Sequence, residues 1–261
     1  INTINTRLDA DTIAYILDHS DAKLLITDTQ FSPTMKKALK IYGKNIPIID
    51  IHDDQAVFKD GEGEQIGEMT YEEFLQTGDD NYNWSLPEDE WQAISLSYTS
   101  GTTGKPKGVV YHHRGSYLMS TGSVTAWNMP NKLTFLYTVP MFHCNGWGYP
   151  WTAALIHAKI ICCRYIVAKD IYNLIDKYKV THFGGAPIVL SLIANADEKD
   201  KKEINHKVYV LTAGAPPTSA ILEKMDNLGF EVMHVYGLTE TYGHILPVSY
   251  THLTLPTKVY V

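Results

Sequence analysis

Residues 98–108 read Tyr98-Thr99-Ser100-Gly101-Thr102-Thr103-Gly104-Lys105-Pro106-Lys107-Gly108 and concentrate five hydroxyl side chains, three glycines and two lysines. The alternating segment 93–98 leads into them and the apolar run 109–111 follows, which predicts a strand, a turn and a second strand. Glycines let backbone N–H groups converge on an anion, while hydroxyl and ammonium groups add donors and charge. We therefore predict a loop that binds polyphosphate.

The spacing of this loop differs from that of a Walker A loop, in which G-x-x-x-x-G-K-[ST] opens a helix. Gly101 and Gly104 stand too close together, Pro106 follows Lys105, and no Ser or Thr follows that lysine. A surface turn rich in Gly, Ser and Thr is the alternative. The length of the polar segment and its apolar flanks disfavour that alternative.

The composition of the whole chain is that of a globular protein. Its 261 residues are 44% hydrophobic and 20% charged, which suffices for one large domain or two small ones. The net charge of −7 argues against a nucleic-acid partner, so anionic substrates must meet local groups such as Lys105 and Lys107. The three cysteines, Cys144, Cys162 and Cys163, show no metal-ligand spacing. Together with the lack of a signal peptide or membrane-length apolar run, this predicts a reduced, cytoplasmic protein.

Helical and strand patterns alternate along the chain. Helices are predicted at 11–19, 33–39, 71–76, 113–126, 146–157, 171–178, 187–194 and 218–228, and strands at 24–27, 46–49, 133–139, 160–163, 181–183, 208–213 and 231–236. This order is typical of βαβ units, so we expect an α/β fold of layered parallel-sheet subdomains flanked by helices. The acidic segment 52–90 is predicted to be a solvated surface excursion rather than a metal site.

A second motif, Tyr236-Gly237-Leu238-Thr239-Glu240, follows a predicted strand, where ligands gather in open α/β sheets. A carboxylate such as that of Glu240 suits a hard cation that bridges phosphates. Taken alone, Thr239 and Glu240 could instead cap a helix. The turn 212–217 also follows a predicted strand, and as an ordinary strand-to-helix turn it has an equally good structural explanation.

Together these segments resemble the AMP-forming adenylating enzymes, the superfamily of acyl-CoA synthetases, luciferases and peptide synthetases. Residues 99–108 are similar to the signature loop of that superfamily, and 236–240 to its Tyr-Gly-x-Thr-Glu motif. The resemblance implies that the phosphates of ATP contact Thr99, Ser100, Gly101, Thr102, Thr103, Gly104, Lys105 and Lys107. It further implies that adenine lies near Gly214, Ala215, Pro216, Tyr236 and Gly237. By the same resemblance Thr239 hydrogen-bonds phosphate and Glu240 holds Mg²⁺.

The segment 140–147 resembles the part of the superfamily that lines the acyl pocket. By that likeness His143 lies beside the reacting carboxylate, although a lone histidine in a hydrophobic frame is more often a core residue. Cys144 and Asn145 stand where amino-acid-activating relatives place an aspartate, which favours an uncharged organic or fatty acid. The remaining expected wall residues are Trp147, Gly184 and Gly185, with the glycines leaving room for an acyl chain.

The resemblance implies an acid–thiol ligase that uses ATP, Mg²⁺ and coenzyme A. A carboxylate attacks the α-phosphorus of ATP and releases pyrophosphate, and the thiol of coenzyme A then converts the acyl adenylate to acyl-CoA and AMP. The expected catalytic residues are Thr239, Glu240 and His143, and the expected substrate is a short- to medium-chain fatty or other organic acid. An amino-acid or aryl-acid adenylating domain and a non-acyl nucleotide-binding module are the alternatives. The sequence predicts no oligomeric state.

The resemblance covers roughly the middle half of a complete adenylating enzyme. We expect residues 1–246 to form a partial AMP-binding domain that lacks its own start and the small C-terminal domain, and to be inactive alone. Residues 247–261 are hypothesised to be non-native, because Val248 to Leu253 is one reading frame of a transposon-end adapter and Thr254 to Thr257 continue it. An ordinary strand is the alternative. The codons of the encoding DNA distinguish the two.

Overall fold

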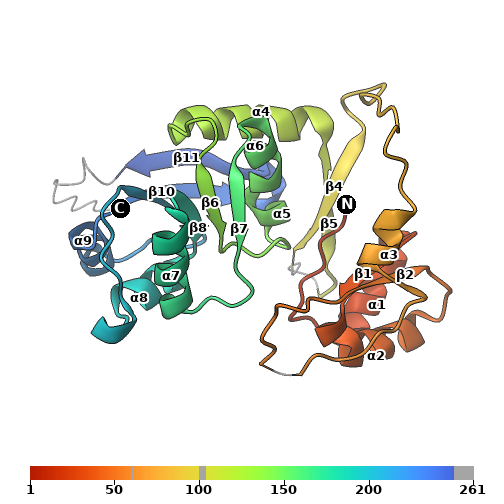
Figure 1. Ribbon diagram of the computed structural model, residues 1–261. Coiled ribbons are helices and arrows are strands. Elements are labelled where there is room, and N and C mark those ends of the chain that lie inside the picture. The colour runs from red at the N-terminus through yellow and green to blue at the C-terminus, as the bar shows by residue number, and fades with distance from the viewer. Residues whose placement is uncertain (60, 100–103, 250–261) are drawn as a thin grey trace. The chain divides into compact units, whose positions relative to one another are not determined.

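A computed structural model describes residues 1–59, 61–99 and 104–249 and divides the chain into two compact units. One unit comprises residues 1–89 and 96–108, and the other comprises residues 90–95 and 109–261. The boundary crosses β4 (Ala93–Thr99) and β5 (Lys107–His112), which form a two-stranded sheet (Figure 1). The two strands predicted on either side of the phosphate loop are therefore confirmed. Ser100, Gly101, Thr102 and Thr103 lie outside the described residues.

The first unit contains a three-stranded parallel sheet. Its strands are β1 (Leu25–Asp28), β2 (Ile48–Ile51) and β3 (Met69–Thr70), in that order. Its helices are α1 (Ala10–His19), the 3-10 turn η1 (Thr29–Phe31), α2 (Ser32–Tyr42) and α3 (Tyr71–Gln76). The apolar faces of α1 and α2 meet the sheet in a core of Ile13, Leu17, Leu25, Met35 and Ala38.

Local side-chain chemistry sets the ends of these helices. The Asp9 carboxylate accepts a hydrogen bond from the N–H of Thr12 at 2.8 Å, so α1 begins at Ala10. Gly43 adopts a left-handed φ of 66° and ends α2. Thr70 and Glu73 form a capping box that starts α3 at its predicted position.

The acidic excursion is more ordered than the sequence indicates, because the buried Asp50 organises it. This carboxylate accepts hydrogen bonds from the N–H groups of Ile66 and Gly67, the latter at 2.6 Å. The returning chain therefore lies along β2 and contributes β3, a strand of only two residues. So short a strand carries no periodicity from which it could be predicted.

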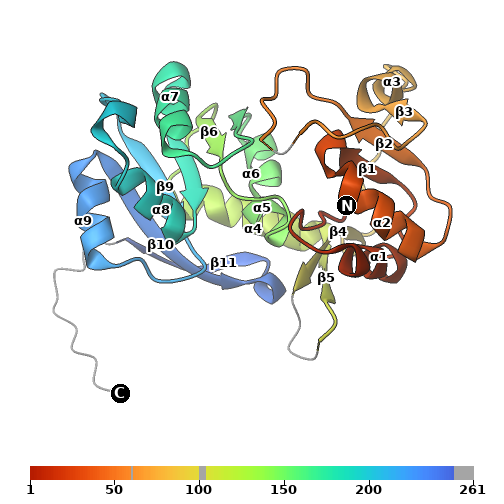
Figure 2. The same cartoon turned by 90° about the horizontal axis from the view of Figure 1, so that it is seen from below.

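The second unit is built on a six-stranded sheet in the order β11-β10-β9-β8-β6-β7. Its strands are β6 (Thr134–Tyr137), β7 (Lys159–Cys162), β8 (His182–Gly185), β9 (Val208–Thr212), β10 (Phe230–Leu238) and β11 (Gly243–Ser249). Strands β6 to β10 are parallel, as predicted. Strand β11, which was not predicted, lies antiparallel to β10 at the edge (Figure 2).

Helices cover both faces of this sheet (Figure 1). Helices α7 (Ala168–Tyr178), α8 (Pro187–Ala194) and α9 (Ser219–Asn227) pack on Leu136, Phe183 and Val210. Residues from the end of α4 (His113–Ala126) and from α6 (Tyr149–Leu155) pack on Phe135 and Leu211. These two residues are adjacent in sequence to Leu136 and Val210 and belong to the opposite face of the sheet. Since successive strand residues point to opposite faces, a sheet covered on both sides reads as the continuous apolar runs seen in the sequence. A short 3-10 turn, η2 (Glu198–Asp200), follows α8.

Helices long and apolar enough to cross a bilayer are absent from the part of the chain that the structure describes.

Candidate functional site

The candidate site of the second unit lies where its parallel strands end. Gly185 at the end of β8 pairs with Thr212 at the end of β9, and Thr212 pairs with His234 of β10. The segments that follow these strands therefore emerge at one edge of the sheet, as does the segment that follows β6. All the predicted adenine, metal and acyl segments belong to this edge.

After β6 the chain makes a left-handed helical turn, α5 (Cys144–Trp147). The φ angles are 42° at Cys144, 45° at Asn145, 65° at Gly146, 58° at Trp147 and 69° at Gly148. A left-handed helical residue with a side chain costs roughly 1–2 kcal/mol, so such a turn persists only where its surroundings impose it. The ordinary helix predicted from residue 146 begins instead at Tyr149.

Buried contacts hold this turn in place. The hydroxyl of Tyr137 donates a hydrogen bond to the carbonyl of Gly146 at 2.9 Å. A Cβ atom at Gly146 would lie 2.0 Å from that hydroxyl oxygen, and one at Gly148 would lie 1.6 Å from the terminal methyl of Met119. Burial raises the pKa of the Tyr137 phenol, so the group remains a donor.

The turn directs Trp147 across the predicted acyl wall. A Cβ atom at Gly184 would lie 3.0 Å from Cζ3 of Trp147, and one at Gly185 would lie 2.9 Å from Cβ of Val189. The indole and the valine thus cover the two glycines that were expected to leave room for an acyl chain. His143, just before the turn, is exposed and is not a core residue.

The predicted nucleotide turn meets this acyl segment. Strand β10 carries Tyr236, which is 53% exposed, and the chain then forms the 3-10 turn η3 (Thr239–Thr241). Sγ of Cys144 lies 3.8 Å from Oγ1 of Thr239. The Glu240 carboxylate is exposed, and within the described residues no hydrogen bond or ion pair engages it.

Two tyrosines that the sequence motifs did not identify, Tyr111 and Tyr242, contact η3. The hydroxyl of Tyr111 on β5 donates to the carbonyl of Thr239 at 2.7 Å, although the two residues are 128 positions apart. The ring of Tyr242 lies 3.9 Å from that of Tyr111, and the indole N–H of Trp151 donates to the Tyr242 hydroxyl at 2.5 Å. No motif links residues so far apart, so only the fold identifies them.

The thiol of Cys144 is not suited to nucleophilic attack. Burial raises its pKa, the nearby Glu240 charge raises it further, and the hydrogen bonds to Thr239 and Tyr111 only partly oppose that. The thiol is therefore protonated at neutral pH. We assign it a packing role between α5 and η3.

The turn after β9 is open on its outer side. Gly214 has a φ of 92°, and no atom would lie within 4 Å of a Cβ atom placed there. The backbone conformation, not crowding, therefore favours glycine. Ala215 and Pro216 are exposed beside it, which leaves space for a flat ligand at this edge.

In the first unit, helix α1 contacts both ends of the phosphate loop. The ring nitrogen Nδ1 of His19 lies 2.8 Å from the hydroxyl of Tyr98, which precedes the loop. The hydroxyl of Tyr15 donates to the carbonyl of Pro106 at 3.4 Å, and Nζ of Lys105 lies 5.3 Å from the centre of the Tyr15 ring. Of the predicted phosphate ligands, Thr99, Gly104, Lys105 and Lys107 are described and belong to this unit.

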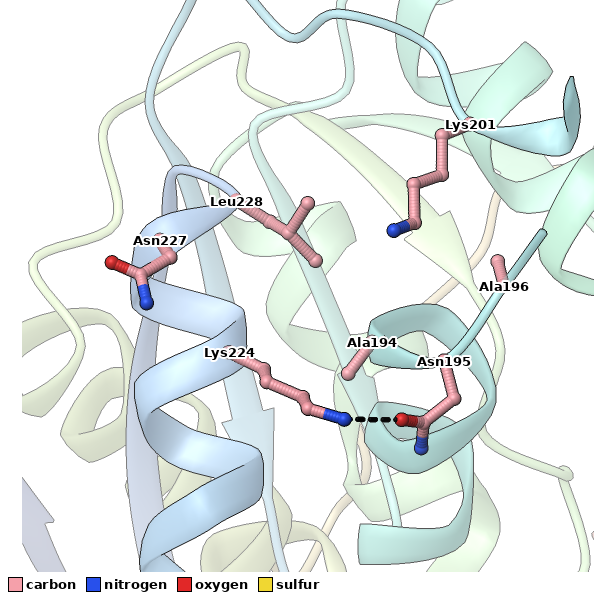
Figure 3. Close-up of a pocket in the computed structure, with 7 residues that line it drawn as sticks. All are labelled: Ala194, Asn195, Ala196, Lys201, Lys224, Asn227 and Leu228. Atoms are coloured by element: carbon pink, nitrogen blue, oxygen red, sulfur yellow. Dashed lines mark hydrogen bonds between the residues drawn. The ribbon is translucent and has the colours of Figure 1, made fainter. Parts of the chain in front are cut away.

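A cavity of about 410 Å³ lies elsewhere in the second unit, by α8 and α9 (Figure 3). Its lining consists of Ala194, Asn195, Ala196, Lys201, Lys224, Asn227 and Leu228. Nζ of Lys224 donates to Oδ1 of Asn195 across it at 2.7 Å. It contains none of the predicted site residues. Nor do three or more His, Cys, Asp or Glu side chains gather into a metal site anywhere in the described ranges.

Comparison with known proteins gives concordant matches. The profile of the family described as AMP-binding enzyme matches residues 1–259. Acetate/butyrate–CoA ligase AAE7 of Arabidopsis thaliana is 43% identical over 93% of the chain, and acetate–CoA ligase CCL3 of Humulus lupulus is 44% identical over 93%. The match covers 44% of each relative, so the chain spans less than half the length of these enzymes.

Solved structures show the same fold. The N-terminal domain of FACL13 from Mycobacterium tuberculosis superposes with a TM-score of 0.77 at 24% identity, covering 95% of this chain and 58% of that one. O-succinylbenzoate coenzyme A synthetase from Bacillus subtilis, in complex with ATP and magnesium ion, gives a TM-score of 0.72 at 22% identity, covering 95% and 46%.

Proposed function

The chain belongs to the AMP-binding enzyme family, and from that premise we propose that it is part of an acid–thiol ligase, an enzyme that joins a short-chain carboxylic acid to coenzyme A. In this reaction the carboxylate attacks the α-phosphorus of ATP and pyrophosphate leaves. The thiol of coenzyme A then attacks the acyl carbon of the acyl adenylate, and AMP leaves. The printed activities of the relatives, acetate/butyrate–CoA and acetate–CoA ligation, agree with this proposal.

The observation that carries the proposal is the contact between Cys144 and Thr239, at 3.8 Å. It joins the segment expected to hold the acid to the turn expected to hold the nucleotide. Adenylation requires a carboxylate beside the α-phosphorus, two like-charged groups that do not approach each other unaided in water. A module that only binds nucleotides has no need of this apposition, which disfavours that alternative.

The residues at the end of β10 fit a metal-bound nucleotide. Mg²⁺ is a hard cation that takes oxygen ligands, and the exposed, unengaged Glu240 carboxylate of the described chain can supply one. When bound, the ion offsets negative charge on the phosphates. Tyr236 offers an exposed ring face for adenine, the Gly214 turn a second wall, and Thr239 a hydroxyl for phosphate. Lys105 and Lys107 would neutralise the outer phosphates.

Two features support an uncharged, short acid. Trp147 and Val189 cover the glycine wall and so limit the length of an acyl chain there. Cys144 and Asn145 supply no carboxylate to hold an ammonium group, which disfavours amino acids. His143 is exposed next to this wall and would orient the reacting carboxylate. We therefore propose that acids at the short end of the predicted short- to medium-chain range are the substrates.

Domain organisation and location complete the proposal. We propose that residues 1–246 belong to an AMP-binding domain, and that residues 247–261 are non-native. Residues 247–249 contribute to β11, so sequencing of the encoding DNA is the direct test of that hypothesis. We also propose a cytoplasmic enzyme without a nucleic-acid partner. The AAE7 relative is described as peroxisomal, and recovery of the enzyme in purified peroxisomes would refute a cytoplasmic location.

A substrate panel on the full-length enzyme tests the function. Acetate, butyrate, 2-methylpropanoate, octanoate, benzoate and alanine are offered with ATP, Mg²⁺ and coenzyme A, and AMP and acyl-CoA are measured. We expect the three short acids to be used best, and we expect Trp147→Ala to raise kcat/KM for octanoate relative to butyrate. Formation of ADP, or a preference for benzoate or alanine, would refute the proposal.

A further inference from the structure

We propose that Tyr111 and Tyr242 are positioning residues that hold the turn of Thr239 and Glu240 in the shape that presents its hydroxyl and carboxylate to a metal-bound nucleotide. The inference rests on the proposed function, since it assigns these tyrosines a part in that same site. Neither tyrosine belongs to the segments that identify the family in the sequence. Their roles follow from contacts within the second unit.

Tyr111 fixes the peptide between the two functional residues. Its hydroxyl donates to the carbonyl oxygen of Thr239 at 2.7 Å, and the N–H of Tyr242 donates to the same oxygen at 3.1 Å. That carbonyl belongs to the planar peptide unit that joins Thr239 to Glu240. The orientation of this peptide therefore sets the direction in which the Glu240 side chain projects from the turn. Tyr111 is 5% exposed, so water competes little for this hydrogen bond.

Tyr242 holds the other end of the turn at a conformational cost. It adopts φ 55° and ψ 45°, a left-handed conformation that glycine would adopt more easily. Its ring lies 3.9 Å from that of Tyr111 in a tilted arrangement, and its hydroxyl accepts from the indole N–H of Trp151. A large side chain at a position that favours glycine indicates that its ring contacts compensate for the strain.

The arrangement makes the turn rigid before any ligand arrives. Tyr111 lies on β5 and its hydroxyl donates to the carbonyl of Thr239, whose own hydroxyl lies 3.8 Å from Sγ of Cys144 in the acyl turn. One buried phenol therefore supports the residue at which the nucleotide turn meets the acyl turn. Preorganisation of this kind lowers the entropic cost of binding.

Amide exchange tests the positioning role without any nucleotide. Tyr111→Phe removes the hydroxyl and keeps the ring, so the exchange of the Tyr242 amide, measured by NMR on the 261-residue chain, should accelerate about five-fold. Tyr117→Phe is the matched control, because it removes a phenol hydroxyl from a residue that is 62% exposed on α4. Equal exchange rates at Tyr242 in the two variants would overturn the proposal.

Calorimetric titration tests the link to the metal-bound nucleotide. We expect Tyr111→Phe and Tyr242→Phe to weaken binding of Mg-ATP about five-fold and binding of ATP in EDTA by less, because only the metal-bound nucleotide uses the Glu240 carboxylate as well as the Thr239 hydroxyl. A purely structural role would instead weaken both equally, with a lower thermal midpoint, and would overturn the proposal. Absence of Mg-ATP binding by the wild-type full-length enzyme would refute the proposed function, while the exchange experiment would still decide the positioning role.

Discussion

Acidification from pH 7.5 to pH 5 should destabilise the second unit through two buried histidines. Burial lowers the pKa of His182 to about 4 and that of His244 to about 4. His182 lies between the rings of Trp127 and Tyr209, with ring-centre distances of 5.0 and 4.9 Å. Within the described chain, Nε2 of each histidine is buried and has no hydrogen-bond partner. Protonation would therefore place a charge in an apolar site.

The size and sign of the effect follow from these pKa values. An unfolded histidine has a pKa of about 6.5, so below that pH the unfolded state binds protons that the folded state rejects. The unfolding free energy is therefore at its full value above about pH 6.5 and decreases as the pH falls toward 4. Each histidine should remove about 2 kcal/mol of unfolding free energy at pH 5 and roughly 3 kcal/mol by pH 4.

Urea unfolding followed by the NMR amide signals of Leu136 and Val210 reports on the second unit alone. His182→Phe keeps a ring in the aromatic cluster and removes the titration, so its stability loss between pH 7.5 and pH 5 should be about 2 kcal/mol smaller than that of the wild type. The comparison at pH 8 isolates the packing change. A His182→Phe variant with the full wild-type acid loss, or a His182 ring signal that titrates near pH 6.5, would refute the reasoning.

Three further predictions concern the site. Gly146→Ala forces a Cβ atom to within 2.0 Å of the Tyr137 hydroxyl and should cost about 2–4 kcal/mol of unfolding free energy, so an unchanged calorimetric midpoint contradicts it. Glu240→Gln should remove most of the Mg²⁺ dependence of ATP binding, and a titration that retains this dependence argues against a metal ligand there. His19→Phe should weaken ATP binding about five-fold, because it removes the hydrogen-bond partner of the Tyr98 hydroxyl. Adding Tyr98→Phe should cause no further loss of affinity, and additive losses in the double variant would contradict a coupled role for the pair.

Local sequence determined much of the architecture. The bounds of α3, α4 and α8 agree with the prediction, since a capping box starts α3 and Pro187 starts α8. The alternation of helices and strands predicted the parallel sheets, because βαβ units are one of few ways to bury continuous apolar runs. The family resemblance rested on residues 99–108 and 236–240, and the comparisons confirmed it.

The sequence did not predict structural elements that have no local periodicity. Strand β3 has two residues and depends on the hydrogen bonds that Asp50 makes to residues 66 and 67. Strand β11 reverses direction because the chain turns through Thr239 to Tyr242, and no periodicity in residues 243–249 specifies that reversal. The sequence predicted a right-handed helix from residue 146, because the glycines at 146 and 148 do not show whether a turn is left-handed or right-handed.

The sequence by itself determined which chemical groups are available for the proposed reaction: a hydroxyl-rich loop with two lysines, a carboxylate after a strand, and a hydrophobic segment around one histidine. Only the tertiary structure decided that Cys144 contacts Thr239 and that Tyr111 supports the carbonyl of that threonine. The physical reason is that these contacts join residues about a hundred positions apart. Whether such residues meet depends on how the whole sheet is stacked and ordered, and no local pattern contains that information.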